Sequence, residues 1–308
     1  MTEPYYTTPR ERATTITDQA NDEARVYCCL DAHGRPDPPL VTAVLVAAVI
    51  IAYHTGGAAP SLNTSSFSAS ITYAAGESAW YTSLSASLGH LHPTHLWSNV
   101  AMLAAAGALC EVTEGHLRMV LLAWGGATLG FGFYGAIAQT GSTVVGISGI
   151  IYALIWVELA MLALNWSQMF FRWLRLGGML ALLTADLVLY LAGQQGDSVA
   201  FWAHVGGQLA GILIGLAIGV NVVRQAWEVW LRVIGVVGVG VMVIVVMARQ
   251  QIAAGVLGAL LLPFLVAKAR YDMQRAARQV ERLASGGTLD LAKVLPVNPN
   301  DGPQPRPH

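Results

Sequence analysis

The feature that most constrains this chain is a series of apolar runs, most of them close to the ~20 residues that a helix needs to cross a bilayer. We expect eight membrane-spanning helices, at residues 40–59, 94–110, 117–138, 146–165, 177–194, 199–222, 230–248 and 252–268. The last two are short and closely joined, so a re-entrant hairpin is the alternative for them. Charged residues make up only 11% of the chain, against about 25% in an average soluble domain. The sequence therefore predicts an all-α polytopic membrane protein.

The positions of the basic residues predict which ends of these helices face the cytoplasm. Cytoplasmic loops are enriched in Lys and Arg. With a cytoplasmic N-terminus, the predicted topology places all but Arg249 of the 17 Lys and Arg residues on the inner side. The long loop at residues 60–93 contains neither residue type. We therefore expect a cell-membrane protein with both termini in the cytoplasm, and with loop 60–93 and the starts of the fourth and sixth helices on the outer side.

Three segments with polar residues lie at the outer ends of predicted helices. Their residues of interest are His90, His92, His95 and Asn99 around the start of the second helix, Gly146, Ser148, Gly149 and Tyr152 in the fourth, and Ala203, His204 and Gly207 in the sixth. Polar side chains are costly in a membrane and tend to face the helix bundle or a water-filled cavity. On the sixth helix the face that bears His204 also carries a series of glycines beginning with Gly207, and small residues let another helix approach closely. With Gly146 and Gly149 beside it, Ser148 is predicted to come within reach of His204.

The pairing of Ser148 with His204 predicts a serine nucleophile that is activated by a histidine base. A serine hydroxyl is a poor nucleophile until a base removes its proton. His204 would take that proton and later give it to the leaving amine. His95, Asn99 and the Ser148 amide are candidate donors to the oxyanion of the tetrahedral intermediate. We expect a dyad rather than a triad, with Tyr152 packed against His204, because no acidic residue is evident near the outer face.

These motifs resemble those of the rhomboid protease family over about residues 75–222. The matching positions are His95 and Asn99 in the second helix, Ser148 in a GxSG motif with Tyr152 one turn on, Ala203 and His204 followed by Gly207, Gly211 and Gly215, Glu111 within a Gly-and-Glu turn, and His90, which matches a histidine of some members. The first loop departs from the family, because Trp80 and Tyr81 stand where Trp-Arg is common.

The resemblance implies a cofactor-independent intramembrane serine endopeptidase that cleaves the membrane-spanning segments of other membrane proteins. It implies a six-helix protease core at residues 39–223, followed by two additional membrane helices at 224–268, and a cap over the site at about 193–199. We expect a polar cytoplasmic tail at 1–38 and a basic one at 269–308. Because the net charge is −1, nucleic acid is not an expected partner; the bilayer and membrane-protein substrates are.

Three alternatives stay open from the sequence. His90, His92 and His95 could be read as a metal site, but no carboxylate or thiol completes a tetrahedral set, so no metal is expected. Glu158 and Asp186 lie inside predicted helices and are compatible with a transporter, although no internal repeat accompanies them. The nearest rival is a rhomboid-like protein that binds membrane proteins without cleaving them, but such proteins lack the Ser or the His.

Overall fold

A computed structural model of the chain describes residues 38–57, 73–75, 81–138, 142–166, 169, 171–191, 199–219, 228–249, 251–271 and 274. Within these ranges the regular structure is helical apart from one two-stranded antiparallel sheet. The predicted N-terminal tail, the cap and most of the basic C-terminal tail lie outside the described residues.

The described elements are mostly helices, which follow one another along the chain. In order they are α2 (Leu40–Ala52), η1 (Tyr53–Gly57), β1 (Tyr73–Ala74), α4 (Thr82–Ser85), η2 (Ala86–Leu88), α5 (Pro93–Met102), η3 (Leu103–Gly107), α6 (Ala108–Glu114), α7 (His116–Ile137), β2 (Thr143–Val144), α8 (Ser148–Asn165), α9 (Arg172–Leu191), α10 (Val199–Ile218), α11 (Glu228–Ala248) and α12 (Ile252–Ala259). The elements α5, η3 and α6 form one continuous helix, and helical structure continues beyond α12 to Tyr271.

Six helices are long and apolar enough to cross a membrane. They are Pro93–Glu114, His116–Ile137, Ser148–Asn165, Phe201–Ile218, Val229–Ala248 and Ile252–Tyr271. These correspond to six of the eight helices predicted from the sequence. The last two have 20 residues each, which is the length that a full crossing requires, so they need not form a re-entrant hairpin.

The other two predicted spans, 40–59 and 177–194, form helices that are not among these six. The first is a shorter apolar helix, Leu40–Thr55, which is π-helical after Ala52. The second, α9, is 20 residues long, but several of its side chains, including that of Asp186, lie outside the described residues, so this span is not tested. Within its described residues the structure therefore supports six spans, where the sequence predicted eight.

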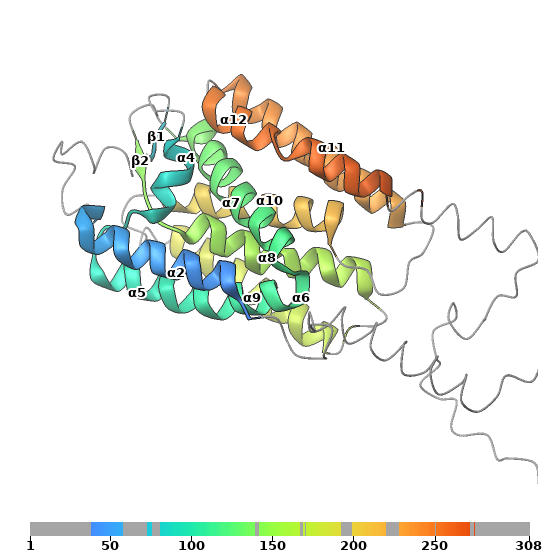
Figure 1. Cartoon of the computed structure of the whole chain (residues 1–308), viewed down its shortest axis with the longest axis horizontal. Coiled ribbons are helices and arrows are strands. Elements are labelled where there is room, and N and C mark those ends of the chain that lie inside the picture. The colour runs from blue at the N-terminus through green and yellow to red at the C-terminus, as the bar shows by residue number, and fades with distance from the viewer. Residues whose placement is uncertain are drawn as a thin grey trace, which may run out of the picture.

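The centre of the bundle lies where α7, α8 and α10 meet. Figure 1 shows these three helices in the middle of the molecule, with α2 and α5 on one side and α11 and α12 on the other. The backbones of α8 and α10 are so close that a Cβ at Gly211 would lie 2.2 Å from the carbonyl oxygen of Ala153. Small residues permit such an approach between helices in a membrane, where burial of apolar area gives little driving force.

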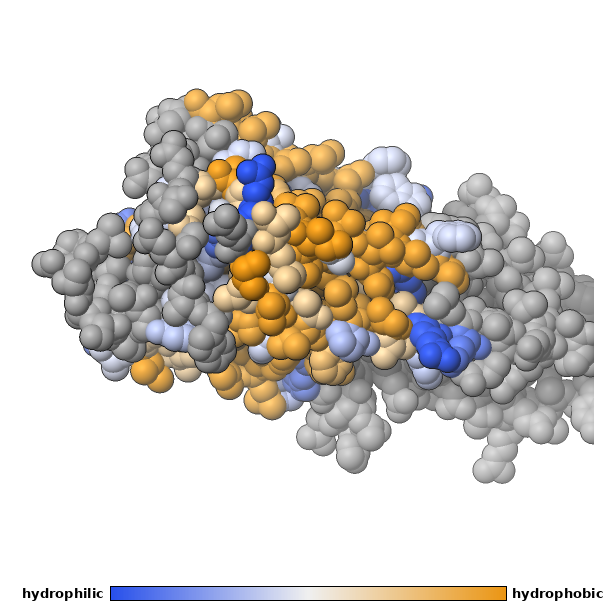
Figure 2. Space-filling view, turned by 90° about the horizontal axis from the view of Figure 1, so that it is seen from above, coloured by the Kyte–Doolittle hydropathy of each residue, from blue (hydrophilic) through white to orange (hydrophobic). Residues whose placement is uncertain are grey.

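The outer faces of the C-terminal helices are apolar. Trp230, Ile244 and Phe264 are each more than half exposed. Figure 2 shows a broad band of hydrophobic residues across the middle of the molecule, with hydrophilic residues scattered around it. Because the helical backbone satisfies its own hydrogen bonds, such a surface is suited to contact with lipid chains.

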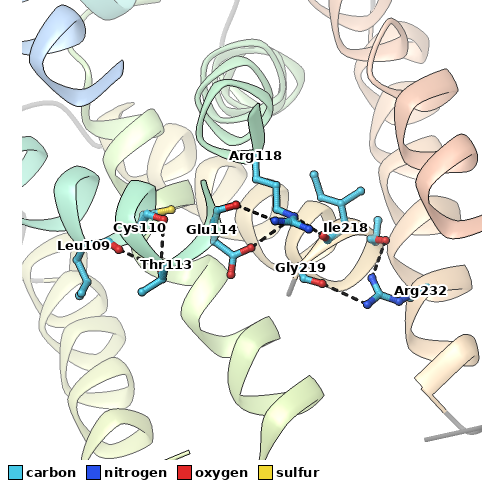
Figure 3. A network of polar contacts seen from close by, with 9 residues as sticks. Leu109, Cys110, Thr113, Glu114, Arg118, Ile218, Gly219 and Arg232 are labelled. Atoms are coloured by element: carbon cyan, nitrogen blue, oxygen red, sulfur yellow. Dashed lines mark hydrogen bonds and ion pairs between the residues drawn. The ribbon is translucent and has the colours of Figure 1, made fainter. Parts of the chain in front are cut away.

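Two arginines bind the carboxyl end of α10 (Figure 3). Arg118 donates from Nε to the carbonyl oxygen of Ile218 at 2.8 Å and lies 3.8 Å from the carboxylate of the buried Glu114. Arg232, only 4% exposed, donates to the carbonyl oxygens on either side of Ile218 at 3.1 and 3.2 Å. The last carbonyls of a helix lack intrahelical partners and attract cations. The arginines therefore hold the end of α10 that lies opposite His204.

Glu111 fastens α2 to the rest of the bundle. Its carboxylate accepts hydrogen bonds from the amides of Val41 and Thr42 at 2.8 Å each, from the Thr42 hydroxyl at 2.7 Å and from His116 Nδ1 at 2.6 Å. The amides in the first turn of a helix need acceptors, and a negative charge is favoured there. Glu111, expected within a turn, thus lies inside α6 and caps the amino end of α2.

Candidate active site

Ser148 and His204 lie within hydrogen-bonding distance of each other. His204 Nε2 is 3.0 Å from Ser148 Oγ. Ser148 is the first residue of α8, and His204 lies near the start of α10. The two helices can meet here because Gly207 faces Gly149, where a Cβ would lie 2.3 Å from the Gly149 carbonyl oxygen. Both side chains are partly exposed, so a reactant can reach them.

Tyr152 packs against the imidazole of His204. The two ring centroids are 4.2 Å apart and the ring planes differ by 18°. Tyr152 follows Ser148 by one helical turn, so both lie on the same face of α8. The stack restricts rotation of the imidazole and keeps Nε2 directed at Ser148. The structure thus brings together the three residues that the sequence placed at one end of two helices.

The turn before Ser148 is built around Gly146. Its φ of +127° lies in a region that L residues rarely adopt. A Cβ there would also lie 3.0 Å from the His95 ring and 3.7 Å from Asn99 Nδ2. After this turn α8 begins, and its first amides have no intrahelical acceptor and carry the positive end of the helix dipole. The amide of Ser148 is therefore placed to bind an anion.

His95 and Asn99 lie one turn apart on α5, next to the turn at Gly146. His95 Nδ1 is buried and has no hydrogen-bond partner among the described residues. Asn99 is 9% exposed. Hydrogen-bond donors from α5 thus stand beside the amino end of α8, where the sequence placed the oxyanion.

His90 orients the side chain of Asn99 through a hydrogen bond. It is fully buried, with Nε2 at 3.1 Å from Asn99 Nδ2 and Nδ1 at 3.3 Å from the carbonyl oxygen of Leu88. Because the Asn99 amide donates to Nε2, the imidazole proton resides on Nδ1 and is donated to Leu88. Burial, together with the neighbouring His95, lowers the pKa of His90 to about 4. His90 therefore stays neutral near pH 7 and fixes the amide group of Asn99.

His92 has a role that sequence reasoning missed. It is the N-cap of α5, where its Nδ1 accepts a hydrogen bond from the His95 amide at 3.1 Å. Histidine is not among the common N-cap residues, so the available signal was Pro93, which favours the first helical position. Among the described residues, no three His, Cys, Asp or Glu side chains are grouped closely enough to hold a metal ion.

Glu158 lies far from Ser148. Ten residues of α8 separate the two, which corresponds to about 15 Å along the helix. Glu158 forms an ion pair with Arg175 of α9. The side chain of Asp186, the other carboxylate of interest, lies outside the described part of the structure. Glu158 therefore has a structural partner and gives no support to a proton pathway through the bundle.

Comparison with known proteins assigns a family to this arrangement. The rhomboid domain family matches residues 77–221, a range that includes every residue of the site and ends before α11. The chain is also similar to rhomboid-related protein 1 of Caenorhabditis elegans, with 29% identity over 151 residues. This match covers 46% of the chain and 41% of that relative, so the chain spans less than half of the relative's length. The resemblance inferred from the motifs is confirmed.

Proposed function

We propose that the protein is a serine endopeptidase that acts inside the membrane, because the chain carries a rhomboid domain at residues 77–221. The family consists of intramembrane serine proteases, and the chain is a multi-pass membrane protein. The observation that carries the proposal is the 3.0 Å contact between Ser148 Oγ and His204 Nε2 at the amino end of α8. Membrane-spanning segments of other proteins are the proposed substrates.

The proposed reaction is acyl transfer to Ser148. As Oγ attacks the peptide carbonyl, His204 Nε2 accepts its proton and then gives it to the leaving amine. The Ser148 amide, His95 and Asn99 stabilise the negative charge on the carbonyl oxygen, and loss of one such donor typically lowers the rate ~10²–10³-fold. A water molecule, activated by the same imidazole, then hydrolyses the acyl-enzyme and restores the serine.

We also propose the placement of this site in the membrane. The arginines at the carboxyl end of α10, Arg118 and Arg232, lie at the end opposite His204. Because basic residues are enriched on the cytoplasmic side, these arginines support a position of Ser148 and His204 toward the outer side. We propose further that α2 and α9 complete a six-helix core, in which Glu111 holds α2, and that α11 and α12 are additional to it.

Cleavage of a single-span fusion protein in liposomes tests this function. We expect the wild type to cleave it, whereas Ser148→Ala and His204→Ala abolish cleavage. Ser98→Ala is the matched control, because Ser98 is an exposed serine of α5 near the site, and it should cleave normally. Cleavage retained by Ser148→Ala would refute the proposal. If the wild type neither cleaves nor reacts with a fluorophosphonate at Ser148, the protein is a non-catalytic binder instead.

A further inference from the structure

The turn between α11 and α12 lies beyond the matched rhomboid domain, yet its Gln251 bonds to the catalytic end of the bundle. Gln251 is 6% exposed and occupies the N-cap position of α12 without capping it. Its Oε1 accepts a hydrogen bond from the Tyr73 hydroxyl at 2.5 Å, and its Nε2 donates to the carbonyl oxygen of Gly135 at 3.3 Å. In Figure 1, α12 reaches the end of the molecule where β1 and β2 lie.

The fit between this glutamine and the bundle is close. A Cβ at Gly135 would lie 2.7 Å from Gln251 Oε1 and 3.0 Å from the Tyr73 hydroxyl. One turn earlier on α7, a Cβ at Gly132 would lie 2.7 Å from the side chain of Val246 in α11. A buried amide that loses its partners is costly. The hydrogen bonds of Gln251 therefore define where the helix pair docks on α7.

Tyr73 continues this connection to the nucleophile. It lies in β1 opposite Val144 of β2, and the amide of Ala75 donates to the carbonyl oxygen of Ser142 at 3.0 Å. Val144 is followed directly by the turn that leads into Ser148. Burial and the adjacent Tyr134 raise the pKa of Tyr73. Its hydroxyl therefore stays protonated and remains the donor to Gln251.

A buried hydrophobic cluster extends the same connection to the base. It joins α11 and α12 with α7, the two strands and the start of α10. Its members are Tyr73, Ala75, Ala86, Phe131, Tyr134, Val144, Ala203, Val246 and Ala254. Ala203 directly precedes His204. Because protein interiors are close-packed and transmit displacements, a shift of the helix pair would move the segments that carry both members of the dyad.

We propose that Gln251 is a positioning residue: through Tyr73 and the β1–β2 pairing, it couples the C-terminal helix pair to the turn before Ser148 and keeps Ser148 at hydrogen-bonding distance from His204. The catalytic consequence rests on the proposed protease function. The coupling itself rests on the hydrogen bonds and the packing described above, so the two are tested separately.

The test compares two variants of this contact with a control that changes another hydrogen bond between α7 and the helix pair. Gln251→Leu removes all the side-chain hydrogen bonds of Gln251 at similar volume, including a long one from Nε2 to the carbonyl oxygen of Arg249 at 3.5 Å, and Tyr73→Phe removes the hydroxyl alone. The control is Trp124→Phe, which removes the 2.9 Å hydrogen bond from Trp124 Nε1 of α7 to the carbonyl oxygen of Leu257 in α12. The measurements are kcat and KM for the fusion substrate in liposomes, and hydrogen–deuterium exchange of peptides that contain Ala75 or residues 142–148.

We expect Gln251→Leu and Tyr73→Phe each to lower kcat about 10-fold, with KM within about twofold, since sub-ångström to 1 Å displacements of reacting groups cost up to ~10²-fold. The double variant should be no slower than either single one, and exchange in both peptides should accelerate about 10-fold. Trp124→Phe should leave kcat and exchange unchanged.

Unchanged kcat and unchanged exchange in Gln251→Leu would overturn the inference. An equal decrease of kcat in Trp124→Phe would also overturn it, because it would mean a general loss of stability. If the wild type neither cleaves nor reacts with a fluorophosphonate at Ser148, the protease proposal fails. The exchange measurement then still decides whether Gln251 positions the turn before Ser148.

Discussion

A single methyl group added at Gly207 should separate the nucleophile from its base. A Cβ at this position would lie 2.3 Å from the carbonyl oxygen of Gly149, whereas ordinary contact begins at 3.4 Å. The opposing atom belongs to the backbone and cannot rotate away, so α8 and α10 must part by about 1 Å. The distance between Ser148 Oγ and His204 Nε2 would then grow from 3.0 Å to about 4 Å, which is too long for a hydrogen bond.

The size of the effect follows from this geometry. A misplacement of about 1 Å can lower the rate ~10²-fold, so we expect Gly207→Ala to lower kcat about 100-fold. Overpacking of a close contact typically costs about 1–3 kcal/mol, so the bundle should remain folded with a reduced Tm. Gly207→Leu should lower activity further, because it adds a larger side chain at the same contact.

The assay is cleavage of a single-span fusion substrate in liposomes, with Tm measured on the same preparations. The matched control is Gly240→Ala on α11, because nothing lies within 4 Å of a Cβ at Gly240. This variant should keep full activity. If Gly207→Ala is folded and cleaves at the wild-type rate, the close approach of α8 and α10 does not set the geometry of the dyad, and the reasoning fails.

Three further changes have outcomes that follow from particular contacts. Asn99→Ala removes a proposed oxyanion donor and should lower kcat ~10²–10³-fold with little change in KM, which steady-state cleavage kinetics will measure. Glu111→Gln weakens the charge-assisted hydrogen bonds to the amino end of α2 and should lower the free energy of unfolding by about 2 kcal/mol, seen as a lower Tm with kcat largely retained. His90 has a pKa lowered from 6.5 to about 4 by burial, so between these values the unfolded chain binds a proton that the folded protein does not. The free energy of unfolding should therefore fall as the pH falls through this window, by on the order of 3 kcal/mol, and the slope of Tm against pH should flatten in His90→Gln.

Each outcome has a result that contradicts it. If Asn99→Ala retains kcat within about threefold, its amide is not a donor of the size expected. If Glu111→Gln keeps the wild-type Tm, the cap on α2 contributes nothing measurable to stability. If the slope of Tm against pH is the same in His90→Gln as in the wild type, another group is responsible for the pH dependence.

The pairing of α8 with α10 could be predicted because its cause is a short-range pattern. Gly207, Gly211 and Gly215 recur every four residues and share a face with His204. In the structure all three face α8, where a Cβ would lie 2.2 to 2.7 Å from its atoms. Likewise, the spacing of four between His95 and Asn99 placed both on one side of a helix. Local periodicity therefore carried most of the information about the site.

The contacts of Gln251 could not be predicted in the same way. Its partner Tyr73 is 178 positions away in the chain, and the strand that contains Tyr73 has only two residues, too few to show alternation. The resemblance to a known family ended before α11 and gave no guide to this region. The change from α-helix to a π-helical turn after Ala52 was also missed, because no proline or charged residue marks it.

The hydrogen bonds of Arg118 and Arg232 to the carboxyl end of α10 fix the axial register of that helix. His204 lies about 21 Å from Ile218 along the helix axis, and this length alone determines the height at which the imidazole meets Ser148. Deleting one residue between His204 and Ile218 would draw the imidazole about 1.5 Å along the axis and turn it by about 100°, away from the serine. The segment can therefore accept no change of length.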